Sequence, residues 1–415
     1  MKLCDLNLEY KSRTILDSRG NPTSEVDIIF ADRTFRSSCP SGASVGLNEC
    51  IVLVDGRTKY NGKNIEDVHH IIKDVICPLL KDSDADPLDS TNMDKILLSI
   101  DASDNKQNVG VNSILPFSLS FCKLSAYLNN ELLFSYISKL YGATPKMPLP
   151  HFNVLNGGKH SGNEFSIQEI MIVFESMNIQ ENIESASVFY QELKKTITKH
   201  YGGSFSSVGD EGGFAPPIQS MDEAILLLKE TGDNCNKKDF KIAIDVAANS
   251  FYENGSYIMN GIKMSTNELC EYYIQLINKY PLIYSIEDPF SEEDIKGWEM
   301  LSKKAPRSLN IVGDDLTVTN SNTVKYAGEN NLCNVLLVKP NQIGSVTETL
   351  EAVRIAREHG MKIMVSHRSG ETEDTFISHL AVGIGSEYIK AGAPCRGERV
   401  AKYNELLRIY EGLNK

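Results

Sequence analysis

The feature that most constrains the fold is a short apolar segment ending in an ionisable residue, which recurs six times in the second half of the chain. The segments span residues 240–245, 282–287, 310–314, 334–339, 362–367 and 387–390. After a longer first interval they recur about every 25 residues, which fits one loop, one helix and one strand. Six such units predict an α/β barrel, which binds ligands at the carboxyl ends of its strands. An open doubly wound sheet is the alternative, but it places ligands only at a switch point.

The first part of the chain has a different pattern, in which strands precede helices. A turn cluster at 17–22 separates residues 14–16 from the alternating segment 23–30 and predicts a hairpin, with a third strand near 33–37. Helical periodicity follows from residue 64 to about 140. We therefore expect a smaller α+β domain over 1–138 and the barrel over 139–415. The loop at 40–46, with two glycines and two serines, is either a linker or a lid over a ligand.

Composition excludes several classes of function. The net charge of −13 argues against nucleic acid or an anionic membrane as the main partner. No apolar run approaches the roughly 18 residues of a membrane span, and the first residues lack the apolar core of a signal peptide. The nine cysteines include no C-x-x-C pair, which favours reduced, mostly buried thiols. We expect a cytoplasmic protein.

Three of the strand-ending residues are carboxylates, Asp245, Glu287 and Asp314. Carboxylates that meet at one face of a barrel repel each other unless a cation lies among them. Oxygen ligands without neighbouring His or Cys favour Mg²⁺ over zinc. A single strand-end acid is more often a helix cap, but three in consecutive units predict a metal site.

The remaining strand-ending residues suggest acid–base chemistry on an anion. Lys339 and Lys390 end apolar strands, and a cation beside a lysine is expected to lower its pKa toward neutrality and make it a general base. His367, followed by Arg368, Ser369 and Gly370, is typical of an anion site, although a polar turn leaving the core has the same pattern.

Two loops add candidate acids. Glu211 lies in a loop with three glycines, which allow the backbone to approach a ligand closely, and it is a candidate acid or base opposite the lysine. A polar cluster near the end of another predicted strand contains His160, Gln168 and Glu169, and is a weaker signal by itself.

Several motifs together resemble the enolase family over nearly the whole chain. The most specific is 364–374, and the supporting motifs lie at 17–22, 41–44, 209–216, 285–289, 313–320 and 339–342. The resemblance implies a lyase of glycolysis and gluconeogenesis that reversibly dehydrates 2-phospho-D-glycerate to phosphoenolpyruvate. It also implies two Mg²⁺ per active site, a barrel with an antiparallel start, and a homodimeric or octameric assembly.

The resemblance further implies a role for each matched residue. Lys339 would remove the C2 proton, and Glu211, supported by Glu169, would protonate the leaving C3 hydroxyl. The ligands of the two metals would be Asp245, Glu287, Asp314 and, in the loop, Ser44. The substrate would be bound by Ser44, His160, Gln168, Glu169, Lys339, His367, Arg368, Ser369 and Lys390.

The chain departs from the family pattern mainly in the first domain. Val45 replaces a threonine in the loop, and Val52 and Val54 stand where glutamate and arginine are usual. These changes motivate an alternative, a paralogue that acts on a related phosphono- or phospho-acid in a specialised pathway. Family members also bind plasminogen at the cell surface through exposed lysines, for which Lys415 is the candidate here.

Overall fold

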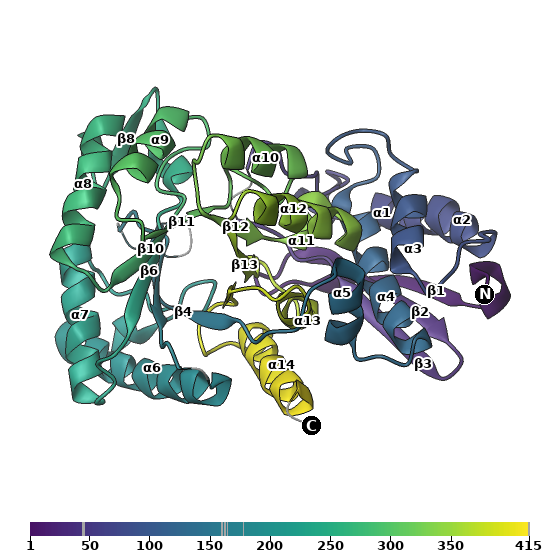
Figure 1. Cartoon of the computed structure of the whole chain (residues 1–415), viewed down its shortest axis with the longest axis horizontal. Helices are drawn as coiled ribbons and strands as arrows, with labels where there is room; N and C mark the ends of the chain where they lie inside the picture. The colour runs from purple at the N-terminus through teal and green to yellow at the C-terminus, as the bar shows by residue number, and fades with distance from the viewer. Residues whose placement is uncertain (44–45, 159–160, 162, 164, 177, 414–415) are drawn as a thin grey trace.

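The chain forms a small sheet-and-helix domain beside a closed barrel, as the computed structural model shows (Figure 1). The structure describes residues 1–415 except 44–45, 159–160, 162, 164, 177 and 414–415. The barrel strands follow the order β10-β11-β12-β13-β14-β4-β5-β6. This arrangement confirms the predicted α/β barrel preceded by a smaller α+β region and rules out the open doubly wound sheet.

The N-terminal part contains an antiparallel three-stranded sheet covered by helices. Its strands are β1 (Glu9–Leu16), β2 (Pro22–Phe30) and β3 (Arg33–Ser38). The predicted hairpin is present, because β1 and β2 pair antiparallel. Within its turn, Asp17 Oδ1 accepts hydrogen bonds from the backbone N–H groups of Arg19 and Asn21. The helical elements are η1 (Leu3–Leu6), η2 (Lys59–Gly62), α1 (Glu66–Ile71), η3 (Ile72–Ile76), α2 (Cys77–Lys81), α3 (Ser90–Leu98), α4 (Val111–Leu128) and α5 (Leu133–Tyr141).

The six predicted strands are all present, and two more precede them. The barrel strands are β4 (Leu149–Asn156), β5 (Glu169–Val173), β6 (Lys241–Asp245), β10 (Ile283–Glu287), β11 (Asn310–Gly313), β12 (Val335–Val338), β13 (Lys362–Ser366) and β14 (Tyr388–Lys390). Only β5 runs antiparallel to its neighbours β4 and β6, and the other pairs are parallel. The longer first interval is filled by a small antiparallel sheet of β7 (Tyr252–Glu253), β8 (Ser256–Met259) and β9 (Ile262–Met264).

Helices connect the barrel strands and pack around their outer face. They are α6 (Ile179–Tyr201), η5 (Gly203–Ser206), α7 (Met221–Asn234), η6 (Ala248–Phe251), α8 (Thr266–Lys279), α9 (Ile295–Lys304), α10 (Ser321–Glu329), α11 (Pro340–Ile343), α12 (Val346–Glu358), α13 (Phe376–Gly383) and α14 (Gly397–Leu413). Most begin with a side-chain cap; Ser265, for example, accepts from Glu268 N–H in a complete capping box at α8.

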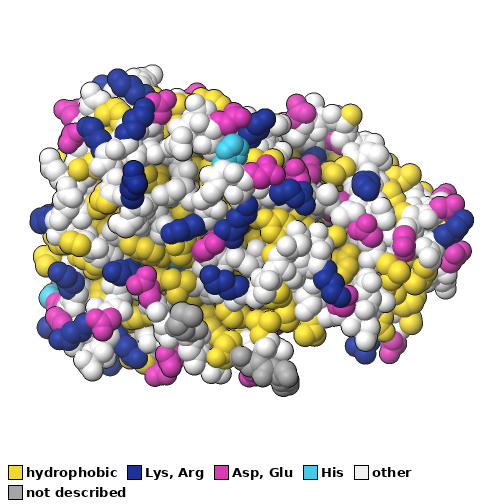
Figure 2. Space-filling view, viewed as in Figure 1, with side chains coloured by type: hydrophobic (Ala, Val, Ile, Leu, Met, Phe, Trp, Pro, Cys, Tyr) yellow, Lys and Arg dark blue, Asp and Glu magenta, His cyan; other side chains and the backbone are white. Residues whose placement is uncertain are grey.

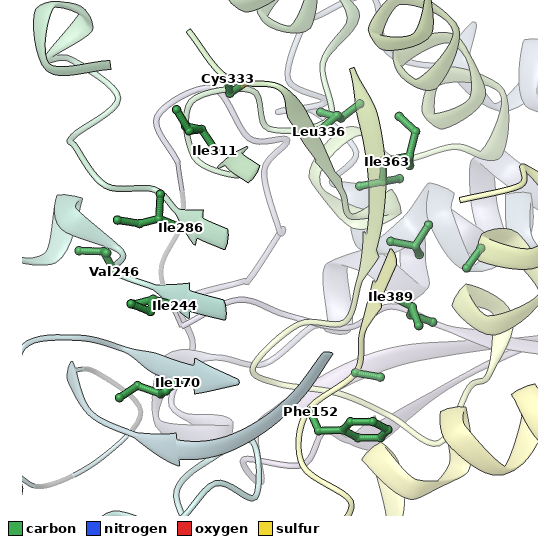
Figure 3. Close-up of a cluster of buried hydrophobic side chains, with 14 of the residues drawn as sticks. Phe152, Ile170, Ile244, Val246, Ile286, Ile311, Cys333, Leu336, Ile363 and Ile389 are labelled. Atoms are coloured by element: carbon green, nitrogen blue, oxygen red, sulfur yellow. The ribbon is translucent and has the colours of Figure 1, made fainter. Parts of the chain in front are cut away.

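The alternation of side chains along each strand separates the core from the site. Ile244, Ile286 and Ile389 belong to the large cluster between the strands and the helices, to which every barrel strand contributes (Figure 3). The strand residues that alternate with these face the barrel interior and fill it. They include Val312, Val335, Leu337, Met364 and Tyr388. Because successive strand residues face opposite sides, the ionisable residue that follows each of these isoleucines faces the interior.

The expected domain boundary at 138/139 falls inside α5, which packs against both α4 and α13. Several polar contacts also join the two parts, including the Lys106–Glu348 ion pair at 2.9 Å and the Ser38–Thr372 hydroxyl pair at 2.6 Å. The boundary therefore remains a prediction, while the contacts hold the first domain against the barrel.

The surface is mixed in charge, with Lys, Arg, Asp and Glu side chains interspersed over the face seen in Figure 2. Among the helices that the structure describes, none combines the length and the apolar character that crossing a membrane requires. All nine cysteines are free, and five of them are buried, which confirms the prediction of reduced, mostly buried thiols.

A polar aromatic layer lies inside the barrel, away from the carboxyl ends of the strands. His151 of β4 is fully buried, and its Nε2 accepts from the Tyr284 hydroxyl at 2.5 Å while its Nδ1 lies 3.3 Å from Leu149 O. The Tyr388 ring packs edge-on against the imidazole. Burial lowers the pKa of His151 to about 3, so this imidazole is neutral in the folded protein.

The buried His151 predicts a loss of stability in acid. The imidazole of His151 binds a proton near pH 6.5 in the unfolded chain, but only near pH 3 in the folded chain. The free energy of unfolding therefore decreases as pH falls from about 6.5 toward 3. Urea unfolding at several pH values measures this dependence. His151→Gln is expected to flatten it, whereas His70→Gln, at an exposed position, is expected not to. An equally steep dependence in His151→Gln would contradict the assignment.

Candidate active site

Strand register brings three carboxylates to adjacent positions inside the barrel. Glu169 of β5 pairs with Asp245 of β6, and Asp245 pairs with Glu287 of β10. All three are buried. Burial and the negative charge of Asp245 raise the pKa of Glu287 well above its ordinary value. The predicted meeting of strand-end acids is thus present, with Glu169 added to the set.

The ammonium group of Lys390 lies among these carboxylates. Lys390 Nζ is 2.7 Å from Glu287 Oε1, 3.1 Å from Asp245 Oδ2 and 3.6 Å from Glu169 Oε1. Burial alone would lower the pKa of Lys390, but the three carboxylates outweigh it and hold the pKa well above the ordinary value. Lys390 therefore carries a positive charge among these carboxylates near neutral pH.

Lys339 has a different partner. Its Nζ lies 2.5 Å from Asp314 Oδ2, while Gln342 Nε2 donates to Asp314 Oδ1 at 2.8 Å. Burial opposes the charge on Lys339, but Asp314 prevails and raises the pKa of the lysine. The predicted lowering of this pKa requires a metal ion beside the lysine and stays a prediction; the direct contact with Asp314, one predicted metal ligand, raises the pKa in the structure.

The acid candidates form a second buried group opposite the lysines. Burial and the neighbouring Glu211 raise the pKa of Glu169 well above its ordinary value. Glu211 Oε2 accepts from Asn153 Nδ2 at 2.9 Å and lies 3.5 Å from His367 Nε2. A carboxyl and a carboxylate side by side can store and deliver one proton.

The turn after β13 supplies the positively charged side chain of Arg368. Arg368 is buried, and its Nη1 and Nη2 donate to the two carboxylate oxygens of Glu49 at 2.9 and 3.2 Å. Burial opposes the charge, but Glu49 prevails and raises the pKa of Arg368. Such a bidentate pair fixes the plane of a guanidinium, so the Arg368 side chain has a fixed orientation beside the cavity.

The beginning of the 40–46 loop lies against this turn. Ser41 and Gly370 exchange two backbone hydrogen bonds at 2.7 and 2.8 Å, and Ala43 N–H donates to Ser369 Oγ at 2.6 Å. A Cβ on Gly370 would approach Ser41 Oγ to 2.5 Å, which explains the glycine. The predicted site residues Ser44 and His160 lie outside the described residues, as does Lys415.

One cavity gathers most of the predicted residues. Gly42 and Ala43 line it together with Gln168, Glu169, Glu211, Asp245, Lys339, Ser366, His367, Arg368, Ser369 and Lys390. Glu287 and Asp314 lie behind this lining, in contact with the two lysines. Gln168 Oε1 is buried and has no hydrogen-bond partner among the described residues. The predicted residues that the structure describes therefore converge on one small polar cavity.

The carboxylate group fits a divalent cation. Glu287 Oε2 is buried and accepts no hydrogen bond within the part of the chain that the structure describes. Asp288, Asp314 and Asp315 also bring carboxylate oxygens within 4.8 Å of one another. An all-oxygen set suits Mg²⁺. Of the predicted ligands, Asp245 and Glu287 both contact Lys390 Nζ, whereas Asp314 contacts Lys339 Nζ and lies with Asp288 and Asp315, so their sharing of one ion stays a prediction.

Sequence reasoning assigned no role to Glu49 or Gln342. Glu49 Oε1 accepts from Gln342 Nε2 at 3.2 Å and from Gly46 N–H at 3.2 Å, in addition to its pairing with Arg368. The first domain thus inserts one carboxylate into the barrel site. The available signal was an acid within an otherwise mostly apolar segment, because a buried acid requires a charged or hydrogen-bonding partner.

Metal binding can be tested without turnover. A ligand bound only by the folded chain stabilises it by about 2.7 kcal/mol at one hundred times Kd, so Mg²⁺ should raise the Tm of the wild type. Glu287→Gln should lose most of that increase, whereas Asp222→Asn, at a surface pair with Lys279, should keep it. A full Mg²⁺-dependent shift in Glu287→Gln would rule out this carboxylate as a ligand.

Comparison with known protein families agrees with this geometry. A family model for the enolase N-terminal domain matches residues 9–137. A second model, for the enolase C-terminal TIM barrel domain, matches residues 144–415, more than half of the chain. The two matches correspond to the small sheet-and-helix domain and to the barrel that carries the site. On this evidence the chain belongs to the enolase family.

Proposed function

We propose that the protein catalyses the reversible, Mg²⁺-dependent dehydration of 2-phospho-D-glycerate to phosphoenolpyruvate. The observation that carries the proposal is one buried cavity with two lysines facing an acid pair, Glu169 and Glu211. Removal of a proton next to a carboxylate and departure of a hydroxyl require a base, an acid and fixed positive charge. Family membership supports a lyase of this kind.

Each group has a distinct task in the proposed reaction. Lys339, once it has released its proton, takes the C2 proton of the substrate through Nζ. The C3–O bond then breaks, the pair of Glu211 and Glu169 donates a proton, and the hydroxyl leaves as water while the C2–C3 double bond forms. Lys390, which carries a positive charge, stabilises the carboxylate that gains electron density.

The metal and the anion site complete the proposal. Bound Mg²⁺ supplies positive charge that offsets the charges of the substrate carboxylate and phosphate. Asp314 would hold the cation as well as contact Lys339, so its contact with Lys339 would weaken and the pKa of that lysine would fall. Arg368 and Ser369 bind the phosphate, and Gln168 offers its buried Oε1 to a substrate hydroxyl.

The broader expectations remain predictions. They are two Mg²⁺ per site with Ser44 as a ligand, a role for His160, a place in glycolysis and gluconeogenesis, a cytoplasmic location, a homodimer or octamer, and plasminogen binding at the cell surface.

Turnover tests the proposal directly. Wild-type protein should convert 2-phosphoglycerate to phosphoenolpyruvate, followed by ultraviolet absorbance, with Mg²⁺ and not after its removal by a chelator. Lys339→Ala should lower kcat by at least about a thousandfold because the base is lost, whereas Lys325→Ala, at an exposed position on α10, should match the wild type. Wild-type protein that fails to turn over 2-phosphoglycerate would contradict the proposal.

The alternative substrate class is tested with the same protein. A panel of phospho- and phosphono-acids, compared by kcat/KM, should rank 2-phosphoglycerate first. A phosphono-acid with a higher kcat/KM would instead support the specialised paralogue.

Glu49 is expected to act through Arg368. Glu49→Gln weakens a buried charge pair and should raise KM roughly tenfold while changing kcat less, because the phosphate contact is made in the ground state as well as in the transition state. Glu348→Gln breaks a different interdomain ion pair, with Lys106, and serves as a control for stability. Equal KM values in Glu49→Gln and the wild type would refute this role.

A further inference from the structure

Arg399 is a fully buried arginine that points at the turn after β13 from the last helix, α14. It lies on the buried face of that helix, since Lys402, Tyr403 and Leu406 follow at helical spacing and are buried as well. A charged residue on such a face needs compensating hydrogen bonds. No role was predicted for Arg399 from the sequence.

The guanidinium of Arg399 donates to three carbonyl groups around the site. Nη1 donates to Arg368 O at 2.5 Å, and Nη2 donates to Ser369 O at 2.6 Å and to Asp210 O at 3.1 Å. The first two carbonyls belong to the anion-binding turn, and the third belongs to the residue before Glu211. The Arg399 side chain therefore connects the turn that carries Arg368 to the loop that carries Glu211.

Arg399 also contacts the imidazole of His367, with Nη1 2.6 Å from Nδ1. A guanidinium can only donate hydrogen bonds, so Nδ1 must accept and cannot carry a proton. Burial lowers the pKa of His367 to about 4, so the ring is neutral and its one proton is on Nε2. Nε2 lies 3.5 Å from Glu211 Oε2.

We propose that Arg399 is a positioning residue that holds His367 as the Nε2–H tautomer, with the protonated nitrogen on the Glu211 side of the ring, where it can donate to the substrate. The inference rests on the proposed function for its catalytic consequence but not for the tautomer itself. In this arrangement Asn153 Nδ2 donates to Glu211 Oε2, while the buried His367 Nε2, 3.5 Å from the same oxygen, has no hydrogen-bond partner among the described residues and can donate to the substrate. The opposite tautomer would place a lone pair against the carboxylate and remove a donor from the cavity.

The tautomer can be observed in the wild-type protein by NMR. Protein with ¹⁵N-labelled histidine has eight imidazoles, and the His367 signals are identified by their loss in His367→Gln. Two-bond ¹H–¹⁵N correlations at neutral pH should show a protonated Nε2 and an unprotonated Nδ1. A protonated Nδ1 on His367 would overturn the proposal, whatever the enzyme's substrate.

Variants test whether Arg399 is the cause. Arg399→Met removes the donor and should give a mixed or reversed tautomer, with kcat lowered roughly ten- to a hundredfold and KM changed less. Arg399→Lys, which can still donate, should restore part of kcat and the Nε2–H signal. Lys402→Met removes the buried cation one turn along, which pairs with Glu371 at 2.8 Å, and should leave the His367 tautomer unchanged.

The outcomes separate the two proposals. An unchanged tautomer in Arg399→Met contradicts the positioning role even if the variant is less stable. Wild-type protein with the Nε2–H tautomer but no turnover of 2-phosphoglycerate would refute the proposed function and leave the assignment of Arg399 intact. If Arg399→Met does not fold, the wild-type spectrum together with Arg399→Lys still decides the question.

Discussion

The buried ammonium of Lys390 among Asp245, Glu287 and Glu169 is the interaction on which the rest of the site depends. Carboxylates on neighbouring barrel strands would repel each other strongly without a cation between them. Lys390 supplies one from β14 and is within 3.6 Å of all three. One ammonium group does not balance the charge of all three carboxylates. Glu287 Oε2, for example, is buried without a hydrogen-bond partner among the described residues and can bind a divalent cation.

Charge balance also explains why two domains build one site. The barrel provides lysines and acids at its strand ends, while Glu49 of the first domain neutralises Arg368 in the same cavity wall. A chain of contacts then runs from Lys339 through Asp314, Gln342 and Glu49 to Arg368. A change at one end of this chain alters the electrostatic environment at the other, which couples the proposed base to the proposed phosphate contact.

The sequence allowed prediction of the barrel because its strands are short and end in ionisable residues at regular intervals. It predicted the convergence of Asp245, Glu287, Lys339 and Lys390 for the same reason. The antiparallel β5 followed only from resemblance, since the pattern of 169–173 does not differ from that of a parallel strand. Glu49, Gln342 and Arg399 gained no role because their partners are distant in sequence. The direction in which Asp314 shifts the pKa of Lys339 could not be predicted from the sequence, because it depends on which carboxylate the lysine side chain contacts.

In the proposed reaction, Lys339 removes the C2 proton, and Glu211 and Glu169 act only when the hydroxyl leaves. The most direct test is exchange of the C2 hydrogen of 2-phosphoglycerate with deuterated solvent, measured by NMR in the presence of Mg²⁺. We expect Glu211→Gln to exchange the C2 hydrogen at a rate well above its dehydration rate, and Lys339→Ala not to exchange it. Exchange in Lys339→Ala, or its loss in Glu211→Gln, would contradict the assignment of base and acid.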